Sequence, residues 1–195
     1  MSSLKERVRR LEDDLRAKPM RHFVYNDLPF AVFVYEPDKE WEMRHEMHLL
    51  KTRLENDGVC RISFISIAEL LWQSIDESEG METISDYEVN QGFMAAQQQI
   101  YDYLSDPMWR PLPDLLTERL DKLDPQQDLA FLWRAGALAP DMYRVSNLLD
   151  QMKGRTRVPC VLFMPATIEG SDGLRFMDLS LHERRGSYHT KVYVD

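Results

Sequence analysis

The segment from Asp128 to Met164 constrains the fold of this 195-residue chain more than any other segment. "DLAFLW" (Asp128–Trp133) is a short apolar run typical of a buried strand, and "VPCVLFM" (Val158–Met164) is a second one. Between them, Asp141–Lys153 carries an apolar face at helical spacing, formed by Met142, Val145, Leu149 and Met152. A strand, a helix and a strand at this spacing predict a parallel strand pair joined by a right-handed crossover.

The rest of the chain continues this alternation. "PFAVFVY" (Pro29–Tyr35) and "CRISFISI" (Cys60–Ile67) are predicted strands, and a helix from about Pro37 to Asp57 is expected between them. "GLRFMDL" and "HTKVYV" predict two short strands later in the chain, the last of them at an edge. We therefore expect residues 1–195 to form a single three-layer α/β domain. Its sheet should be mainly parallel, with about four to six strands, in a P-loop/Rossmann-like architecture without a Walker A motif.

Two helical regions lie outside this alternation. Residues 2–16 predict an amphipathic helix whose apolar stripe is formed by Leu4, Val8, Leu11 and Leu15. Such a helix either packs on its parent domain or serves as a docking or dimer helix. Residues of about 77–124 carry more helical pattern than one crossover needs. We interpret them as a helical insertion on one edge of the sheet.

Composition restricts the class of protein. The chain is 44% hydrophobic, yet no apolar run approaches the roughly 20 residues of a membrane span. The charged N-terminal segment lacks the apolar centre of a secretory signal. Cys60 and Cys160 lie in apolar runs, which is typical of core thiols in a reducing compartment, so a cytoplasmic protein is expected.

The charge is uneven along the chain. The net charge is −9, whereas residues 150–195 hold seven Lys and Arg against six Asp and Glu. A protein whose whole surface grips DNA needs clustered Lys and Arg, so the overall acidity argues against that class. A weak contact with DNA through Arg155, Arg157, Arg184 and Arg185 remains an alternative.

The stretch "MKGRTRVPCVLFMP" (Met152–Pro165) contains the lysine, glycine and threonine that hold phosphates in nucleotide-binding loops. Its position argues against that function, because it follows a helix and precedes a strand. Open α/β sheets bind ligands at the carboxyl ends of their strands, and no G-x-x-x-x-G-K-S/T motif occurs in the chain. Gly154 is therefore predicted to end the helix.

Arg134 and Gly136 follow a predicted strand and are the candidates at the correct end of the sheet. The Arg134 guanidinium either holds an anionic ligand, as in a degenerate nucleotide-binding domain, or satisfies loop carbonyls or a carboxylate as a structural fork. Ser66, three residues before Glu69, has the spacing of a helix cap and lacks the context of a nucleophile.

We expect no catalytic residue, no cofactor and no metal ion. His45 and His48 are three residues apart rather than in the H-E-x-x-H pattern of a zinc helix, so a solvated helix face is predicted. Trp41 is predicted on the outer face of the same helix. It either covers the helical insertion or anchors a partner, since tryptophan is enriched at interface hot spots.

Three blocks, in this order and spacing, carry a family resemblance: "LPFAVFVYEPDKEWEMR", "LWRAGALAPDMYRVSNLLDQMKGRTRVPCVLFMPA" and "GLRFMDL". They resemble the BrxB family of bacterial BREX phage-defence systems, and the resemblance covers essentially the whole chain. Two positions differ from the family's usual pattern, because Ala166 and Asp178 stand where glycine is common.

The resemblance implies a small cytoplasmic component of a defence system in which a methyltransferase marks host DNA and other components block phage replication. It also implies a protein without an assigned set of catalytic residues, which acts by binding another BREX component. The expected partner is PglZ, of the alkaline-phosphatase superfamily. A non-enzymatic adaptor is therefore predicted, with no membrane contact and no small-molecule substrate. The residues predicted to bind the partner are Leu4, Val8, Leu11, Trp41, Arg155 and Arg157.

Overall fold

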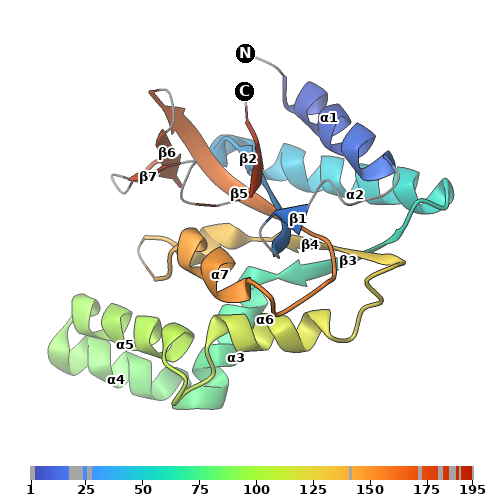
Figure 1. Ribbon diagram of the computed structural model, residues 1–195. Helices are drawn as coiled ribbons and strands as arrows, with labels where there is room; N and C mark the ends of the chain where they lie inside the picture. The colour runs from blue at the N-terminus through green and yellow to red at the C-terminus, as the bar shows by residue number, and fades with distance from the viewer. Residues whose placement is uncertain are drawn as a thin grey trace.

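The strands lie in one sheet between two helical layers, as Figure 1 shows for the computed structural model. The structure describes residues 3–17, 24–25, 28–140, 142–170, 173–179, 182–184, 188 and 190–194. The strands are β1 (Val24–Tyr25), β2 (Leu28–Tyr35), β3 (Arg61–Ser66), β4 (Asp128–Trp133), β5 (Cys160–Glu169), β6 (Gly173–Phe176), β7 (His182–Arg184) and β8 (Lys191–Tyr193). The helices are α1 (Leu4–Arg16), α2 (Glu40–Asn56), α3 (Ile67–Ser78), α4 (Gly80–Gln91), α5 (Phe93–Ser105), α6 (Leu112–Leu120) and α7 (Val145–Met152), with 3-10 turns η2 (Pro37–Lys39) and η3 (Ala135–Leu138).

Five parallel strands form the body of the sheet in the order β8-β2-β5-β4-β3. Numbered among themselves along the chain, these strands lie in the order 5-1-4-3-2, which differs from the doubly wound orders of dinucleotide and flavin domains. Strands β1, β6 and β7 extend the sheet with antiparallel pairs. The predicted α/β architecture with a mainly parallel sheet is confirmed.

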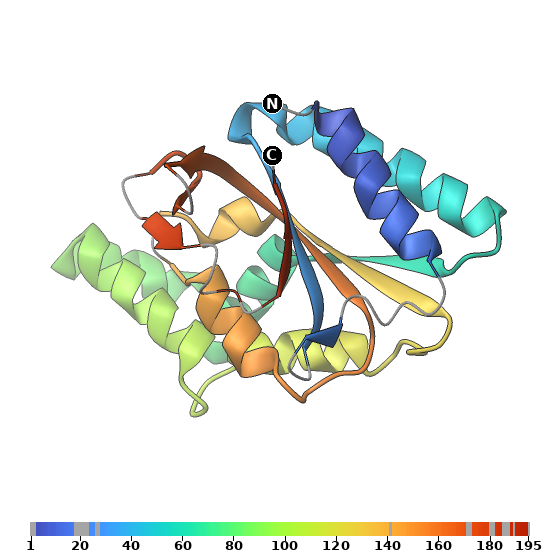
Figure 2. The ribbon, with the colours of Figure 1, turned by 45° about the horizontal axis from the view of Figure 1, so that its top comes forward.

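Side chains alternate between the two faces of the sheet, and each face has its own apolar cluster. One face packs under α1 and α2, with Phe33, Phe131 and Phe163 at its centre. The other packs against α3, α6 and α7 through residues such as Val32, Leu132 and Leu162. Figure 2 shows the helical layers on either side of the twisted strands. Both faces of β2 are covered, so all eight of its residues are buried, which is why its sequence is apolar throughout.

The N-terminal helix α1 packs on its own domain. Ser3 and Glu6 form a reciprocal capping box at its start. The stripe predicted from the sequence is buried, with exposed fractions of 7% or less for Leu4, Val8, Leu11 and Leu15. The prediction that Leu4, Val8 and Leu11 bind a partner is therefore wrong, because these side chains fill the core above the sheet.

Arg7 anchors α1 to β2 through polar contacts. Its Nη1 donates to the Val34 carbonyl at 3.1 Å, and its Nη2 lies 2.8 Å from Glu36 Oε2. The guanidinium is almost fully buried, so the ion pair and the carbonyl contact compensate the loss of water around the charge.

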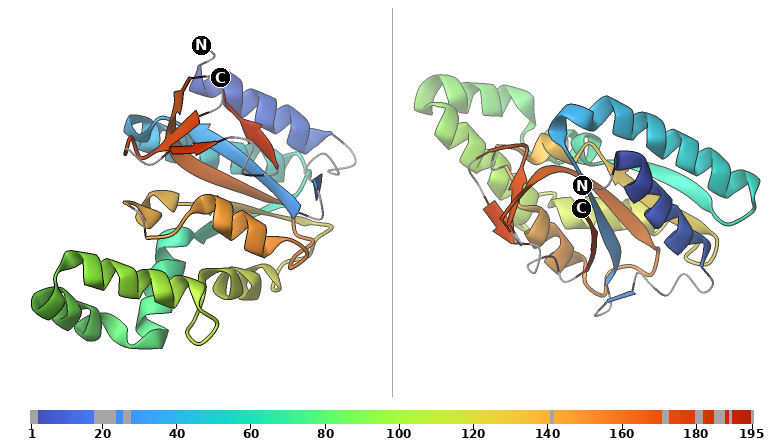
Figure 3. Two further views of the ribbon diagram at one scale, coloured as in Figure 1. Left: turned by 60° about the vertical axis from the view of Figure 1, so that its left-hand side comes forward. Right: turned by 90° about the horizontal axis from the view of Figure 1, so that it is seen from above.

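The helical insertion is shorter than the predicted 77–124. Helices α4 and α5 form a hairpin that projects away from the sheet (Figure 3). Gly92, at φ +90°, separates the two helices. Helix α6, in contrast, buries Leu112, Leu115, Leu116 and Leu120 in the cluster against the sheet. It belongs to the crossover between β3 and β4, so the insertion is the α4–α5 hairpin.

Other local predictions are confirmed or refined. Helix α7 spans Val145–Met152 rather than 141–153, and its C-cap is Lys153; Gly154, which was predicted to end the helix, adopts φ +71° in the turn that follows, closed by a hydrogen bond from the Arg155 amide to the Met152 carbonyl at 3.1 Å. Strand β7 was not predicted. Asp178 adopts φ +58°, a conformation that favours glycine, and accepts a hydrogen bond from Thr167 Oγ1 at 2.5 Å.

Within the described ranges, no helix is both long enough and apolar enough to cross a lipid bilayer.

Candidate functional site

A pocket of about 360 Å³ opens at the carboxyl ends of the parallel strands. Its lining comes from the segments that follow β2, β3 and β4, and from β5 itself. Arg134 and Gly136 both line it, at the end where open α/β sheets bind ligands. The other lining residues are Pro37, Glu40, Arg44, Ala68, Ala137, Pro165 and Met177.

Two tryptophans and two arginines alternate at this pocket, and we call Trp41, Arg44, Trp133 and Arg134 the Trp–Arg stack. The Arg44 guanidinium lies 4.8 Å from the centroid of the Trp41 ring and 5.3 Å from that of Trp133. The Arg134 guanidinium lies 5.9 Å from the centroid of the Trp133 ring. Each contact is a cation–π interaction worth about 0.5–1 kcal/mol at an exposed site. The stack therefore preorganises four large side chains.

Local backbone geometry creates this arrangement. Trp133 ends β4 on the face that packs under α2, where Phe64 meets its ring edge-on at 5.9 Å. Arg134 follows in the left-handed conformation, with φ 58° and ψ 33°, and turns the chain into η3. That conformation is unfavourable for a residue with a Cβ by about 1–2 kcal/mol. The Trp41 and Arg44 side chains meet because residues three apart are neighbours on the surface of α2.

The two arginines differ in their charge environment. Arg44 Nε lies 2.7 Å from Glu40 Oε1, so its charge is largely compensated. Glu40 Oε2 accepts a hydrogen bond from the buried Tyr35 hydroxyl, and burial together with Glu40 raises the pKa of Tyr35. Arg134 is exposed, and in the described part of the chain its guanidinium contacts no carbonyl or carboxylate. Of the two roles considered for Arg134, the structural fork is therefore not what the structure contains, and the binding of an anionic ligand stays a prediction.

The segment that follows β2 does not form a phosphate loop. A phosphate loop would lie between a strand and the helix that follows it, where free backbone amides face the anion. Here Glu36 is succeeded by the 3-10 turn Pro37–Lys39, which contains no glycine and adds Asp38. Carboxylates repel phosphate, and without glycine the backbone is not free to wrap around it. The Trp–Arg stack instead offers flat faces and one uncompensated cation.

The remaining predicted residues lie elsewhere. Arg155 and Arg157 border a separate pocket of about 350 Å³ before β5, at the amino end of the sheet. Arg155 forms an ion pair with Asp114 there, which weakens any contact of this loop with DNA. Arg157 is exposed. The side chain of Arg184 and the whole of Arg185 lie outside the described residues.

Ser66, the two histidines and the two cysteines do not line this pocket. The Glu69 amide donates to Ser66 Oγ at 3.2 Å, which confirms Ser66 as the cap of α3. His45 and His48 are exposed, and no group of three or more metal-binding side chains occurs in the part of the chain that the structure describes. Cys60 and Cys160 are buried free thiols.

Trp41 is 77% exposed on α2, while the α4–α5 hairpin attaches to α3 on the opposite face of the sheet. The interpretation of Trp41 as a cover for the insertion is therefore wrong, and the partner-anchor alternative remains. Sequence reasoning missed Arg44 and Trp133. The signal for them was the Trp-Arg dipeptide at the end of a predicted strand, together with Trp41 and Arg44 one helical turn apart.

Comparison with known proteins finds a matching family model and a relative of similar sequence. The family model described as "BREX protein BrxB" matches residues 63–190. A relative described as "BREX protein BrxB", from Bacillus cereus (strain H3081.97), is 24% identical over 158 residues, covering 79% of each chain. No solved structure matches the chain.

Proposed function

The chain belongs to the BrxB family of BREX proteins, and from this premise we propose that it is a non-enzymatic adaptor in BREX phage defence that binds another BREX component in the bacterial cytoplasm. PglZ is the partner proposed. The observation that carries the proposal is the Trp–Arg stack, with Trp41 and Arg134 exposed, at the strand ends where an enzyme of this fold class would hold its substrate.

The composition of the stack supports binding to a protein. Tryptophan and arginine are the side chains most enriched among residues that dominate interface energies. Trp41 leaves 77% of its surface in water, so it contributes little to the core. Burial of its ring against a partner would remove that apolar surface from water, and Arg44 already holds the ring in place.

The test is co-purification of the tagged chain with PglZ, with affinities measured for Trp41→Ala and Arg134→Ala. Trp72→Ala is the matched control, because Trp72 is also an exposed tryptophan but lies on α3. We expect Trp41→Ala to weaken binding roughly 30-fold, the equivalent of about 2 kcal/mol at a hot spot, and Trp72→Ala to change it less than about threefold.

Failure of the two proteins to associate at any salt or nucleotide concentration would remove PglZ as the partner. Equal losses from Trp41→Ala and Trp72→Ala would show that the stack is not the contact surface.

A second candidate function is regulatory nucleotide binding at Arg134 and Gly136, which the strand-end pocket of about 360 Å³ favours. Thermal denaturation with ATP, GTP and dinucleotides tests it. A nucleotide at 100 times its Kd stabilises the folded state by about 2.7 kcal/mol, which raises the Tm of a domain this size by roughly 5–11 °C. An unchanged Tm at millimolar nucleotide would exclude this function.

A further inference from the structure

The acidity of the chain is concentrated in one segment. Residues 62–109 contain nine Asp and Glu and no Lys or Arg, so this segment accounts for the whole net charge of −9. The remaining 24 acidic residues are matched by all 24 Lys and Arg of the chain. The segment includes the α4–α5 hairpin.

Part of this acidity faces solvent without compensation. Glu77 pairs with Arg110, and Glu79 accepts a hydrogen bond from Tyr103. In contrast, the side chains of Glu82, Asp86 and Glu88 on α4 are exposed and have no cationic partner among the described residues. Helix α4 therefore presents uncompensated carboxylates, with Glu82 and Asp86 on one face and Glu88 on another.

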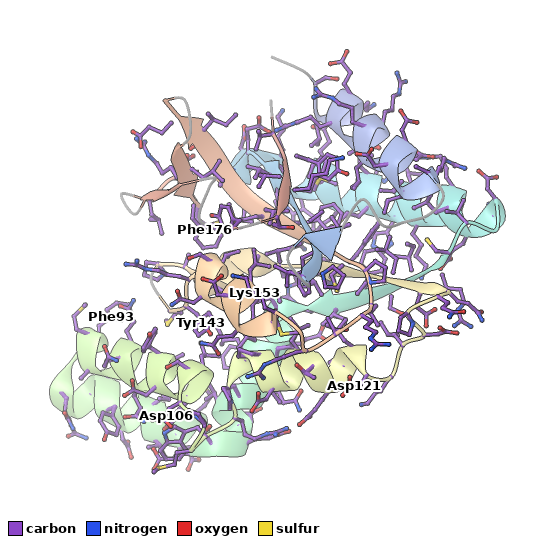
Figure 4. The ribbon with its side chains drawn as sticks, in the orientation of Figure 1. Phe93, Asp106, Asp121, Tyr143, Lys153 and Phe176 are labelled. Atoms are coloured by element: carbon purple, nitrogen blue, oxygen red, sulfur yellow. The ribbon has the colours of Figure 1, made fainter. Side chains whose placement is uncertain are left out.

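The outer end of the hairpin is apolar. Val89, Phe93 and Met94 flank Gly92 and are 80%, 51% and 73% exposed, and we call these three residues the hairpin tip. Figure 4 shows Phe93 at the free end of the hairpin and Asp106 at the other end of α5. Of the twelve residues of α4, only Ile84 is buried. Contiguous exposed apolar side chains rimmed by polar residues mark interaction sites.

A groove of about 400 Å³ continues the tip along α5 towards α7. Met94 and the Tyr101 ring supply its apolar lining, and amide, hydroxyl and guanidinium groups supply its hydrogen-bonding positions. Its lining residues are Met94, Gln97, Gln98, Tyr101, Arg144 and Asn147. The hairpin thus combines an apolar centre with a polar rim, which is the arrangement of protein interfaces.

We propose that the α4–α5 hairpin docks onto a basic surface of a second protein, with Val89, Phe93 and Met94 inserted into an apolar pocket and the carboxylates of α4 facing Lys and Arg around it. The negative charge of α4 is the reason for proposing a basic protein as the partner. DNA, RNA and anionic lipid surfaces are repelled by the same carboxylates, and so is the hairpin of a second copy of this chain.

This proposal goes beyond the proposed function and rests on it only in taking the partner from the BREX system. The hairpin is attached to α3, on one side of the sheet, whereas Trp41 lies on α2 on the other side. The two surfaces therefore allow the chain to bridge two proteins.

The experiment uses the tagged full-length chain in cells that carry the complete BREX system, with captured BREX proteins quantified at increasing salt. The test variants are the triple variant Val89→Ser, Phe93→Ser, Met94→Ser and the charge reversal Glu82→Lys, Asp86→Lys, Glu88→Lys. Met108→Ser is the matched control, because Met108 is 82% exposed but lies outside the hairpin. Trp41→Ala reports on the other surface. The substituted side chains are exposed, so we expect each variant to fold. An unchanged Tm in thermal melting checks this.

For at least one BREX protein captured by the wild-type chain, the captured amount should fall at least tenfold with both hairpin variants. The same protein should be released from the wild-type chain as salt rises. Met108→Ser and Trp41→Ala should still capture it. Capture of the same set by the wild-type chain and both hairpin variants would overturn this proposal and leave the adaptor function intact. A wild-type chain that captures no BREX protein would overturn both.

Discussion

Replacement of Leu11 by alanine tests how α1 contributes to the domain. Leu11 is 0% exposed and packs in the cluster between α1, α2 and the sheet. Removing a buried leucine side chain costs about 2–5 kcal/mol, depending on how far the cavity collapses. A domain of this size has a total unfolding free energy of about 5–15 kcal/mol, so the loss is a large fraction of it. We expect Leu11→Ala to lower the urea midpoint and to lower the Tm by roughly 4–20 °C.

The matched control is Leu49→Ala, because Leu49 is 40% exposed on α2. Its effect should stay within about 0.5 kcal/mol. Packing of α1 on its own domain also predicts a urea midpoint that does not change with protein concentration, whereas a dimer helix makes it concentration-dependent. A loss below about 1 kcal/mol for Leu11→Ala, or a concentration-dependent midpoint, would refute the docked position of α1.

Three further predictions concern the core and its edges. Asp128 accepts hydrogen bonds from Arg61 at 2.6 Å and from the backbone amide of residue 124 at 2.7 Å, and the bond from Arg61 holds the pKa of Asp128 below its ordinary value. Its stabilisation is therefore present above the unfolded pKa of about 4 and lost at lower pH. Urea titrations of Asp128→Ala should show a loss of about 1–2 kcal/mol at pH 7, kept small because solvent screens the exposed Arg61, that shrinks as the pH falls below about 4. Burial raises the pKa of Cys60 to about 11 and that of Cys160 well above its ordinary value. An aromatic disulfide reagent at pH 8 should thus label neither thiol in the native protein and both in guanidinium chloride, and rapid native labelling would contradict the core position. Ser66→Ala removes the cap of α3 and should cost about 1 kcal/mol in urea unfolding, while an unchanged midpoint would show that Ser66 is dispensable.

The strands of the sheet were the most predictable part of the fold. β2 is buried at all eight positions, so its sequence is apolar throughout; β2 and β4 lie within a few residues of the predicted strands, whereas β5 continues beyond the predicted Met164 to the exposed Glu169. Their order was not predictable, because the same runs satisfy any neighbour of similar shape. The position of β2 between β5 and β8 is a result of packing between distant segments.

The helical region shows a second limit. Its apolar periodicity identifies helices but does not say which surface each helix covers. Leu112 and Leu116 face the sheet, while Ile84 is buried within the hairpin layer, and both patterns look alike in the sequence. The Trp–Arg stack was equally hidden, because it depends on the left-handed backbone of Arg134 and on the approach of α2 to the end of β4.

The strand order also determines how long the nascent chain contains β2 before β5, its neighbour in the sheet, has been synthesised. Phe30 of β2 pairs with Cys160 of β5, 130 positions later. At roughly 5–20 residues per second, the ribosome needs about 7–26 s to synthesise that interval. During this time the eight residues of β2, all buried in the finished sheet, lack their neighbouring strand. The chain therefore carries an apolar strand without its β5 neighbour for most of its translation, and unpaired apolar strands of this kind are prone to aggregate.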